Sequence, residues 1–323
     1  MHKRYRGTEL AIDSLLAGAT HPRTICQPLA IDIVTSALRI LVTGASSSLG
    51  QSIGRELQRK GHIAIGTIRR DPRGMDLSMF HELRYADMSK PEDIQNLGPI
   101  FDSVIHAAAL SVGTASELMY SAGLSTAWLA ELCVASHARS IAHVSSMSVY
   151  GDISDDVVTP LTEIRHMHPY GAAKWAAECY LQHQSGQLPS VSVRSPAIVG
   201  RKSLRNFLAV VFESMITQQP IVRVSNPEFL FNNVIHEDTM ASFLVHLACT
   251  TTSGFAAVPV GSTNPIPLRQ VIEQIRIATR YRGRVEWIPQ TTRPFSISVT
   301  AARKLGFEPL STEETIQRWL TVT

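Results

Sequence analysis

The sequence is poor in cysteine. Its 323 residues include four cysteines, which are scattered and form no Cys-x-x-Cys pair: Cys26, Cys133, Cys179 and Cys249. No set of histidines lies near them at the spacing of metal ligands, so the sequence predicts no metal site. Unpaired, scattered cysteines are typical of proteins in a reducing compartment, and we expect a cytoplasmic location.

Long apolar runs and basic clusters are also missing. No apolar run approaches the roughly 18 residues that span a membrane, so we expect no membrane association. The net charge is only +3 and aromatic residues make up 7% of the chain, with no Lys/Arg cluster interleaved among them. We therefore expect no nucleic-acid partner. A hydrophobic content of 44% and a charged content of 18% are ordinary for a globular protein.

The first 37 residues carry little pattern. Lys3, Arg4 and Arg6 begin the segment, but no apolar signal-peptide core follows. Glu9 and Asp13 have the wrong charge for an organelle transit peptide. A short helix is predicted over residues 9–16, and residues 1–37 as a whole are predicted to be a poorly defined extension.

The first strong pattern is a strand, a turn and a helix over residues 39–50. Residues 40–42 predict a buried strand, Gly44 a tight turn, and residues 49–60 a helix with one apolar face. The backbone N–H groups at such a helix start can hold a pyrophosphate. A serine stands where the middle glycine of this pattern is usual. The predicted contacts with a dinucleotide are Thr43, Gly44, Ser47, Leu49 and Gly50.

The second strand, residues 62–68, predicts which dinucleotide is bound. Proteins that bind NAD usually carry an acidic residue at the end of this strand for the ribose hydroxyls, whereas here Arg69 and Arg70 come first. A guanidinium suits a 2′-phosphate because it can bind phosphate through two hydrogen bonds. The sequence therefore favours NADP(H), with Arg69 the first choice for the contact and Arg70 the second, and NAD remains the alternative.

Strands and helices then alternate along the chain, which predicts an α/β fold with a doubly wound parallel sheet and its ligand at the carboxyl ends of the strands. Further strands are predicted at 82–85, 103–105, 141–144, 190–194, 221–224 and 255–260, and helices at 91–97, 122–136, 204–217, 240–248, 267–279, 300–305 and 313–320. Strand ends add Asp87, Met88, Ala107 and Ala108 to the predicted cofactor contacts. Asp87 could meet an adenine amino group or cap the following helix.

Three residues form the predicted proton-transfer site. Ser146 follows the apolar strand at 141–144, and Tyr170 and Lys174 are four residues apart, so that on a helix they share one face. A lysine ammonium beside a phenol favours the phenolate, so we expect Lys174 to lower the pKa of Tyr170. The serine hydroxyl can hold a substrate oxygen against the phenol.

In their order and spacing, these motifs resemble the extended short-chain dehydrogenase/reductase family, the group of NAD-dependent epimerases and dehydratases. The match extends from about residue 38 to the end of the chain and includes Ser146-Met-Ser-Val-Tyr-Gly151, Pro169-Tyr170…Lys174 and Arg194-x-Pro196. The resemblance implies a Rossmann-type sheet, Tyr170 as acid/base, Ser146 as its catalytic partner, and Lys174 at the nicotinamide ribose. It also adds Pro196, Tyr170 and Lys174 to the cofactor contacts and implies a homodimer formed through a helix pair.

The same resemblance divides the chain. Residues 38–195 would bind the dinucleotide, with 231–261 returning to that domain, while 196–230 and 262–323 would form a smaller substrate-binding portion. Departures from the family pattern are Ala122 in place of a helix asparagine and Asn232 in place of an arginine of nucleotide-sugar enzymes. Arg293, the second arginine of those enzymes, is present.

Three functions stay open at this point. The first is an NAD(P)-dependent epimerase or dehydratase acting by hydride transfer on a sugar nucleotide or a related hydroxyl or carbonyl compound. The second is an NADPH-dependent carbonyl reductase similar to dihydroflavonol reductases, which Arg69 favours. The third is a dinucleotide sensor without catalytic activity, since a fold does not fix a function. All three bind a small molecule, and the complete Ser146, Tyr170 and Lys174 set favours an enzyme.

Overall fold

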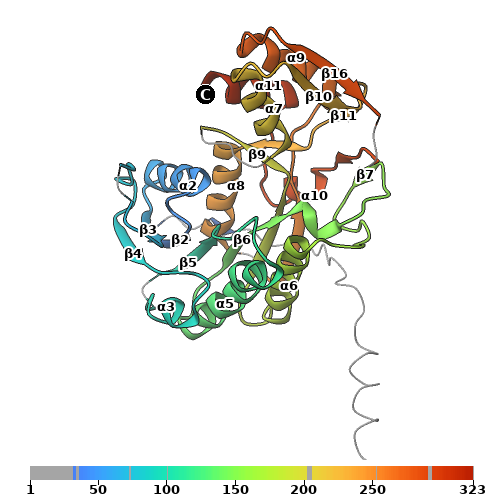
Figure 1. The fold of residues 1–323 in the computed structure, drawn as a ribbon. Coiled ribbons are helices and arrows are strands. Elements are labelled where there is room, and N and C mark those ends of the chain that lie inside the picture. The colour runs from blue at the N-terminus through green and yellow to red at the C-terminus, as the bar shows by residue number, and fades with distance from the viewer. Residues whose placement is uncertain are drawn as a thin grey trace, which may run out of the picture.

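The computed structural model describes residues 32–33, 36–72, 74–99, 101–201, 206–251, 253–289 and 293–322. The helix predicted at 9–16 lies outside the described residues. Seven parallel strands form the central sheet in the order β14-β8-β6-β5-β2-β3-β4 (Figure 1). Their bounds are β2 Arg39–Thr43, β3 Ile63–Ile68, β4 Glu82–Tyr85, β5 Ser103–His106, β6 Ile141–Ser146, β8 Ser190–Ser195 and β14 Phe255–Pro259. The predicted doubly wound parallel sheet is confirmed.

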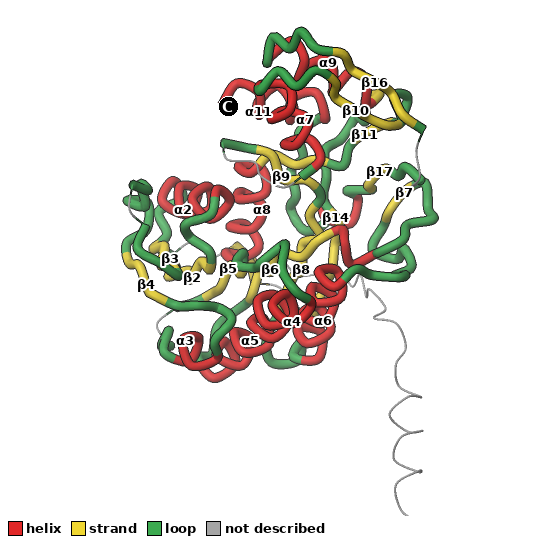
Figure 2. The backbone as a smooth tube through the Cα atoms, viewed as in Figure 1, coloured by secondary structure: helices red, strands yellow, loops and turns green. Residues whose placement is uncertain are grey.

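Helices cover both faces of this sheet (Figure 2). On one face lie α2 (Ser48–Arg59) and α8 (Glu237–Cys249), and on the other α3 (Pro91–Gln95), α5 (Ser125–Ala135) and α6 (Pro169–His183). Alternate residues of a strand point to opposite faces, so in β2 Ile40 and Val42 join the first apolar cluster and Leu41 the second. Burial on both faces explains why the strands read as short apolar runs.

The helix after β5 begins earlier than the sequence predicted. It runs through α4 (Ala115–Leu118), the π-helical turn η1 (Met119–Leu124) and α5. The start signal is a capping box, in which Thr114 and Glu117 each bind the other's backbone N–H. The combined helix, residues 115–135, is long and apolar enough to cross a membrane by length and composition. Half of its most apolar stretch is buried in the protein, as in a core helix packed on a sheet.

A smaller part stands over the carboxyl ends of the strands, at the top of Figure 1. It contains α7 (Phe207–Ile216), α9 (Leu268–Ala278), α11 (Thr312–Val322) and the parallel pair β10 (Ile221–Ser225) and β16 (Arg284–Ile288), around a core that includes Trp319. The short strands are β1 Asp32–Ile33, β7 Val157–Val158, β9 Ala197–Val199, β11 Leu230–Phe231, β12 Val234–His236, β13 Thr250–Thr251, β15 Ile266–Pro267 and β17 Ser296–Ile297, with η2 Met147–Tyr150 and α10 Thr300–Arg303. Because β14 pairs with β8, the segment 231–261 does return a strand to the main sheet. The exact domain limits stay a prediction.

Candidate active site

The turn between β2 and α2 has the geometry of a phosphate cradle. Gly44 has a φ of +74°, and a Cβ there would lie 3.2 Å from the backbone of Ala108. A Cβ on Gly50 would lie 2.2 Å from the carbonyl oxygen of Gly44, so only glycine fits. Ser47, which replaces the expected middle glycine, caps α2: its Oγ accepts from the N–H of Gly50 at 2.9 Å and donates to the Gly44 carbonyl at 2.8 Å. The serine therefore keeps the turn closed.

The hydroxyl of Thr43 ties the end of β2 to the end of β5. Its Oγ1 accepts from the N–H groups of Ala107 and Ala108 at 3.1 and 3.0 Å, and lies 2.7 Å from Nδ1 of His106. With both acceptor positions used, the hydroxyl donates to His106, whose Nε2–H then points to Thr126 at 3.1 Å. Burial lowers the pKa of His106 to about 3, so this histidine is a neutral structural group.

A cavity of about 320 Å³ opens beside this turn. Its lining includes six of the predicted cofactor residues: Gly44, Ser47, Arg69, Asp87, Met88 and Ala108. Thr43 and Ala107 lie at strand ends and Leu49 and Gly50 in the first turn of α2, all outside the cavity walls, and Arg70 is exposed outside the cavity. Pro196 stands between β8 and β9. The glycine turn that a side chain would close, together with the adjoining cavity, fits a dinucleotide.

Asp87 and Arg69 face the same cavity. Asp87 Oδ1 accepts from the N–H and the hydroxyl of Ser89, at 3.0 and 2.7 Å. Burial acts to raise the pKa of Asp87, but the bonds from Ser89 and the charge of Arg69 outweigh it, so that the pKa is lowered. The cap of α3 is Lys90, without a side-chain bond, so the predicted helix-capping alternative for Asp87 is wrong.

Seven of the thirteen lining residues were not predicted from the sequence, and Ser121 is one of them. Ser121 lies in the π-helical turn and lines the cavity, where its hydroxyl accepts from the N–H of Leu110 at 3.2 Å. Ala122, the position compared with the family asparagine, is fully buried and packs against Ala173 of α6. A π turn changes which side chains face a ligand, and no simple helical periodicity reveals it.

Ser146 and Tyr170 meet, as the motif predicts. Ser146 ends β6 and accepts from the N–H of Ser148 at 3.1 Å, while Tyr170 stands in the first turn of α6, close enough to Ser146 for the serine to act on its pKa. The expectation that Lys174 lowers the pKa of Tyr170 is corrected here. Burial raises the pKa of Tyr170, and the opposing influence is the bond with Ser146.

Lys174 is 1% exposed, and its ammonium is bound by groups of β6. Its Nζ donates to the carbonyl of Val144 at 2.7 Å and lies 3.5 Å from Nε2 of His143. Burial lowers the pKa of Lys174 to about 8, and the charge of Glu178 acts in the opposite direction. The lysine therefore remains a cation at neutral pH but is poised to lose its proton under mildly alkaline conditions.

Next to Lys174 lies a buried ion pair. Arg194 and Glu178 are 3% and 2% exposed, and two guanidinium nitrogens reach the carboxylate at 2.6–3.2 Å. Ser145 adds a bond to the same carboxylate at 2.5 Å, and the guanidinium stacks 4.7 Å from the ring centre of Tyr150. Burial acts to lower the pKa of Arg194, but the negative charge of Glu178 outweighs this effect, so the pKa of Arg194 is raised.

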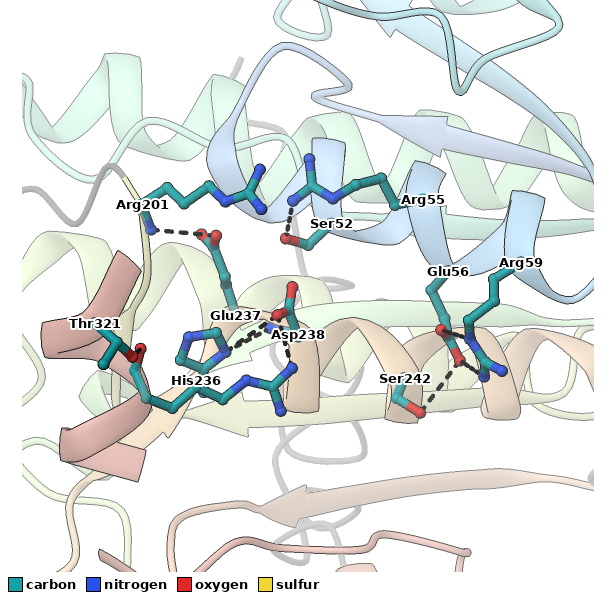
Figure 3. A network of polar contacts seen from close by, with 11 residues as sticks. Ser52, Arg55, Glu56, Arg59, Arg201, His236, Glu237, Asp238, Ser242 and Thr321 are labelled. Carbon is teal, nitrogen blue, oxygen red and sulfur yellow. Dashed lines mark hydrogen bonds and ion pairs between the residues drawn. The ribbon is translucent and has the colours of Figure 1, made fainter. Parts of the chain in front are cut away.

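Helix α8 begins at Glu237, earlier than the predicted residue 240, and His236, Glu237 and Asp238 form its start (Figure 3). His236 caps α8 by accepting from the N–H of Asp238 at 3.2 Å. Glu237 is 3% exposed, accepts from the backbone of Arg201 at 3.2 Å and also bonds the Ser48 hydroxyl. Among the described residues, no group of His, Cys, Asp and Glu is arranged to hold a metal ion.

The two positions compared with substrate-binding arginines differ in their surroundings. Asn232 is 4% exposed, and its amide bonds Ser262 O at 3.1 Å and both Ile297 O and Ile297 N at 2.9 and 2.8 Å. It fixes the surrounding loops and has no surface for a ligand. Arg293 is half exposed and pairs with Asp156 at 2.7 Å.

Comparisons with known proteins agree with this geometry. The model of the NAD dependent epimerase/dehydratase family matches residues 40–245. An uncharacterized protein of Sinorhizobium fredii, y4nG, is 24% identical over 96% of this chain and 80% of its own length. The UDP-Glc/GlcNAc 4-epimerase of Campylobacter jejuni has a similar structure (TM-score 0.75, 17% identity, 88% of this chain and 99% of that one).

MoeE5, solved in complex with UDP-glucose and NAD, is similar in the same way (TM-score 0.73, 21% identity, 88% of this chain and 98% of that one). At these identities the structural likeness shows the shared fold. The family match covers more than half of the chain, including the cradle, Ser146, Tyr170 and Lys174. The chain therefore belongs to the NAD-dependent epimerase/dehydratase family of extended short-chain dehydrogenases/reductases, and it is an enzyme that uses a nicotinamide dinucleotide.

Proposed function

We propose that the protein is an epimerase or dehydratase that acts on a sugar nucleotide or a related hydroxyl or carbonyl compound. The observation that carries the proposal is the placement of Ser146 at the carboxyl end of β6, close enough to Tyr170 to influence its pKa, with Lys174 on the same helix as the tyrosine. The cavity beside the glycine turn supports a dinucleotide site in the same crevice. Structures related in fold include MoeE5 with UDP-glucose, which supports the sugar-nucleotide class.

In this mechanism Tyr170 accepts the proton of a substrate hydroxyl and later returns it, while Ser146 holds that oxygen against the phenol. The bound dinucleotide supplies hydride transfer to and from the substrate carbon. Lys174, on the same helix as Tyr170, would hold the ribose of the dinucleotide, as the family resemblance implies. Burial raises the pKa of Tyr170, so the phenol must first release its own proton to solvent before the phenolate can accept one from the substrate.

An activity assay tests this proposal. The purified protein would be incubated with UDP-glucose, UDP-N-acetylglucosamine and other sugar nucleotides, with no dinucleotide added. We expect an epimer or a keto-sugar product, detected by chromatography and mass, without net change in the amount of reduced dinucleotide. Consumption of NADPH with a carbonyl substrate, and no reaction of sugar nucleotides, would instead support the carbonyl reductase.

We further propose that the dinucleotide is NADP(H). Arg69 lines the cavity, follows β3 directly and exerts its charge on Asp87, which places a cation at the wall where a ribose phosphate would be recognised. The same observation favours the carbonyl reductase as the second candidate function.

Replacing Arg69 by Ala should weaken NADP(H) binding by about 10- to 100-fold and leave NAD(H) binding nearly unchanged, since a charge-assisted hydrogen bond is lost. Titration calorimetry with both dinucleotides measures this. Arg70→Ala is the matched control, because Arg70 is exposed and is not among the residues lining the cavity. Equal affinity of the unmodified protein for both dinucleotides would remove the basis for the NADP(H) proposal.

Location and partners belong to the same proposal. We expect a cytoplasmic enzyme with a small-molecule substrate and without a nucleic-acid or membrane partner. A homodimer formed through a helix pair is supported by two exposed apolar residues of the helix 115–135, Tyr120 (50%) and Leu124 (36%). Their exposure is apolar surface that a second copy could cover.

A further inference from the structure

His143 of β6 lies next to Lys174 of the proposed site. It is fully buried in β6, and its Nε2 is 3.5 Å from Lys174 Nζ, whose other observed bond goes to the Val144 carbonyl at 2.7 Å. An ammonium has three N–H donors. Two of them thus serve groups of β6, which leaves one N–H for a further acceptor.

The hydrogen bonds determine the tautomer of His143. An ammonium can only donate, so Nε2 must be the unprotonated acceptor. Nδ1 then carries the hydrogen and donates to the hydroxyl of Ser192 on β8, 3.0 Å away. Burial also keeps the pKa of His143 well below its ordinary value, so the imidazole stays neutral.

The other ionisable groups around the Lys174 ammonium are Glu178, Arg194, His106 and Tyr170. Glu178 lies one turn further along α6, and its charge is shared with Arg194 of β8. His106 of β5 is neutral and stacks on His143 at 5.7 Å between ring centres. Tyr170 precedes Lys174 by one turn on α6. His143 is therefore the group on β6 whose side chain accepts from Lys174.

We propose that His143 is a positioning residue for catalysis: it accepts a hydrogen bond from Lys174 and, together with the Val144 carbonyl, keeps the ammonium charged and aims its third N–H at the site. The inference rests on the proposed function, in which the Lys174 cation is part of the active site. A phenyl ring in place of the imidazole would leave the buried ammonium with one acceptor fewer, and the cation would be harder to maintain.

The test is the titration of Lys174 itself. The chain has six lysines, so the signals of a protein labelled with ¹³C at lysine Cε can be resolved, and Lys174→Met identifies the relevant one. We expect the midpoint of Lys174 to fall by about one pH unit in His143→Phe, given the size of a charge-assisted hydrogen bond. In His143→Gln, whose amide oxygen can still accept, the midpoint should return towards the unmodified value.

Activity should follow the same order. The alkaline limb of kcat/KM moves down with the Lys174 midpoint in His143→Phe, a loss of about fivefold at pH 8 for a one-unit shift, and is rescued in His143→Gln. His62→Phe is the control for loss of a buried histidine, because His62 bonds Leu38 and Cys249 at a distance from the site and should leave Lys174 unchanged.

Several outcomes would overturn or support the proposed role of His143. An unchanged midpoint in His143→Phe, or equal displacement in His143→Gln and His143→Phe, would overturn the proposal. If His143→Phe does not fold, Ser192→Ala replaces it: loss of the Nδ1 partner should lower the midpoint by a smaller amount, and no change would count against the role of His143. A protein without turnover would remove the proposed function, yet the titration would still decide whether His143 holds the ammonium.

Discussion

Tyr170→Phe is expected to lower kcat by about 10²- to 10⁴-fold, the usual contribution of a positioned acid/base. The substitution removes the phenol oxygen and keeps the ring, so the packing of α6 against η1 should be retained. Steady-state kinetics on the substrate found in the sugar-nucleotide assay measures the effect, and dinucleotide binding should change far less than kcat.

Tyr150→Phe is the matched control. Tyr150 is also buried and close in sequence to Ser146, but its hydroxyl donates to the carbonyl of Thr159 at 2.8 Å and its ring stacks with Arg194. Loss of that hydroxyl should reduce stability by about 1 kcal/mol and leave kcat near its original value. Nearly unchanged turnover in Tyr170→Phe would show that the acid/base is a different group.

The second large effect concerns stability. Arg194→Met should lower the free energy of unfolding by about 3–5 kcal/mol, because it leaves the Glu178 carboxylate buried without its cation. The bond from Ser145 compensates only part of that loss. Urea unfolding followed by circular dichroism at neutral pH measures the change. At neutral pH the variant also places Lys174 next to an unbalanced carboxylate, so its activity is no measure of stability.

A double variant separates the charge from the packing. With Glu178→Gln added to Arg194→Met, the buried group is neutral and can still bond Ser145, so most of the lost stability should return. If Arg194→Met alone costs less than about 1 kcal/mol, the pair is not acting as a buried ion pair. If the double variant is as unstable as the single one, the lost contribution is packing of the arginine side chain.

The sheet could be predicted from the sequence because strands that are buried on both faces consist almost entirely of apolar residues. Successive residues of β2 pack against helices on opposite faces of the sheet. Ile40, Leu41 and Val42 are therefore all buried, and all three are apolar. Ser146 and Tyr170 could be paired from the sequence since both stand where a strand ends or a helix begins. Short strands such as β9 and β12 escaped prediction because three residues carry too little pattern.

The errors at the site have physical causes. A spacing of four places Tyr170 and Lys174 on one helix face, but it says nothing of burial, which raises the pKa of the phenol. Nor does it show that the ammonium is bound by the Val144 carbonyl. The π turn brings Ser121 to the cavity instead of Ala122, and such a turn depends on tertiary packing.

The most direct test of the central claim is to denature the purified protein and identify any dinucleotide released, by chromatography and mass. An enzyme that oxidises and re-reduces its own substrate can keep its dinucleotide bound. We therefore expect a nearly stoichiometric amount, in the NADP(H) form if Arg69 has the proposed role; NAD in the same amount would retain the epimerase or dehydratase and reject that role. An empty protein that binds NADPH only reversibly would contradict the self-recycling mechanism and favour the carbonyl reductase.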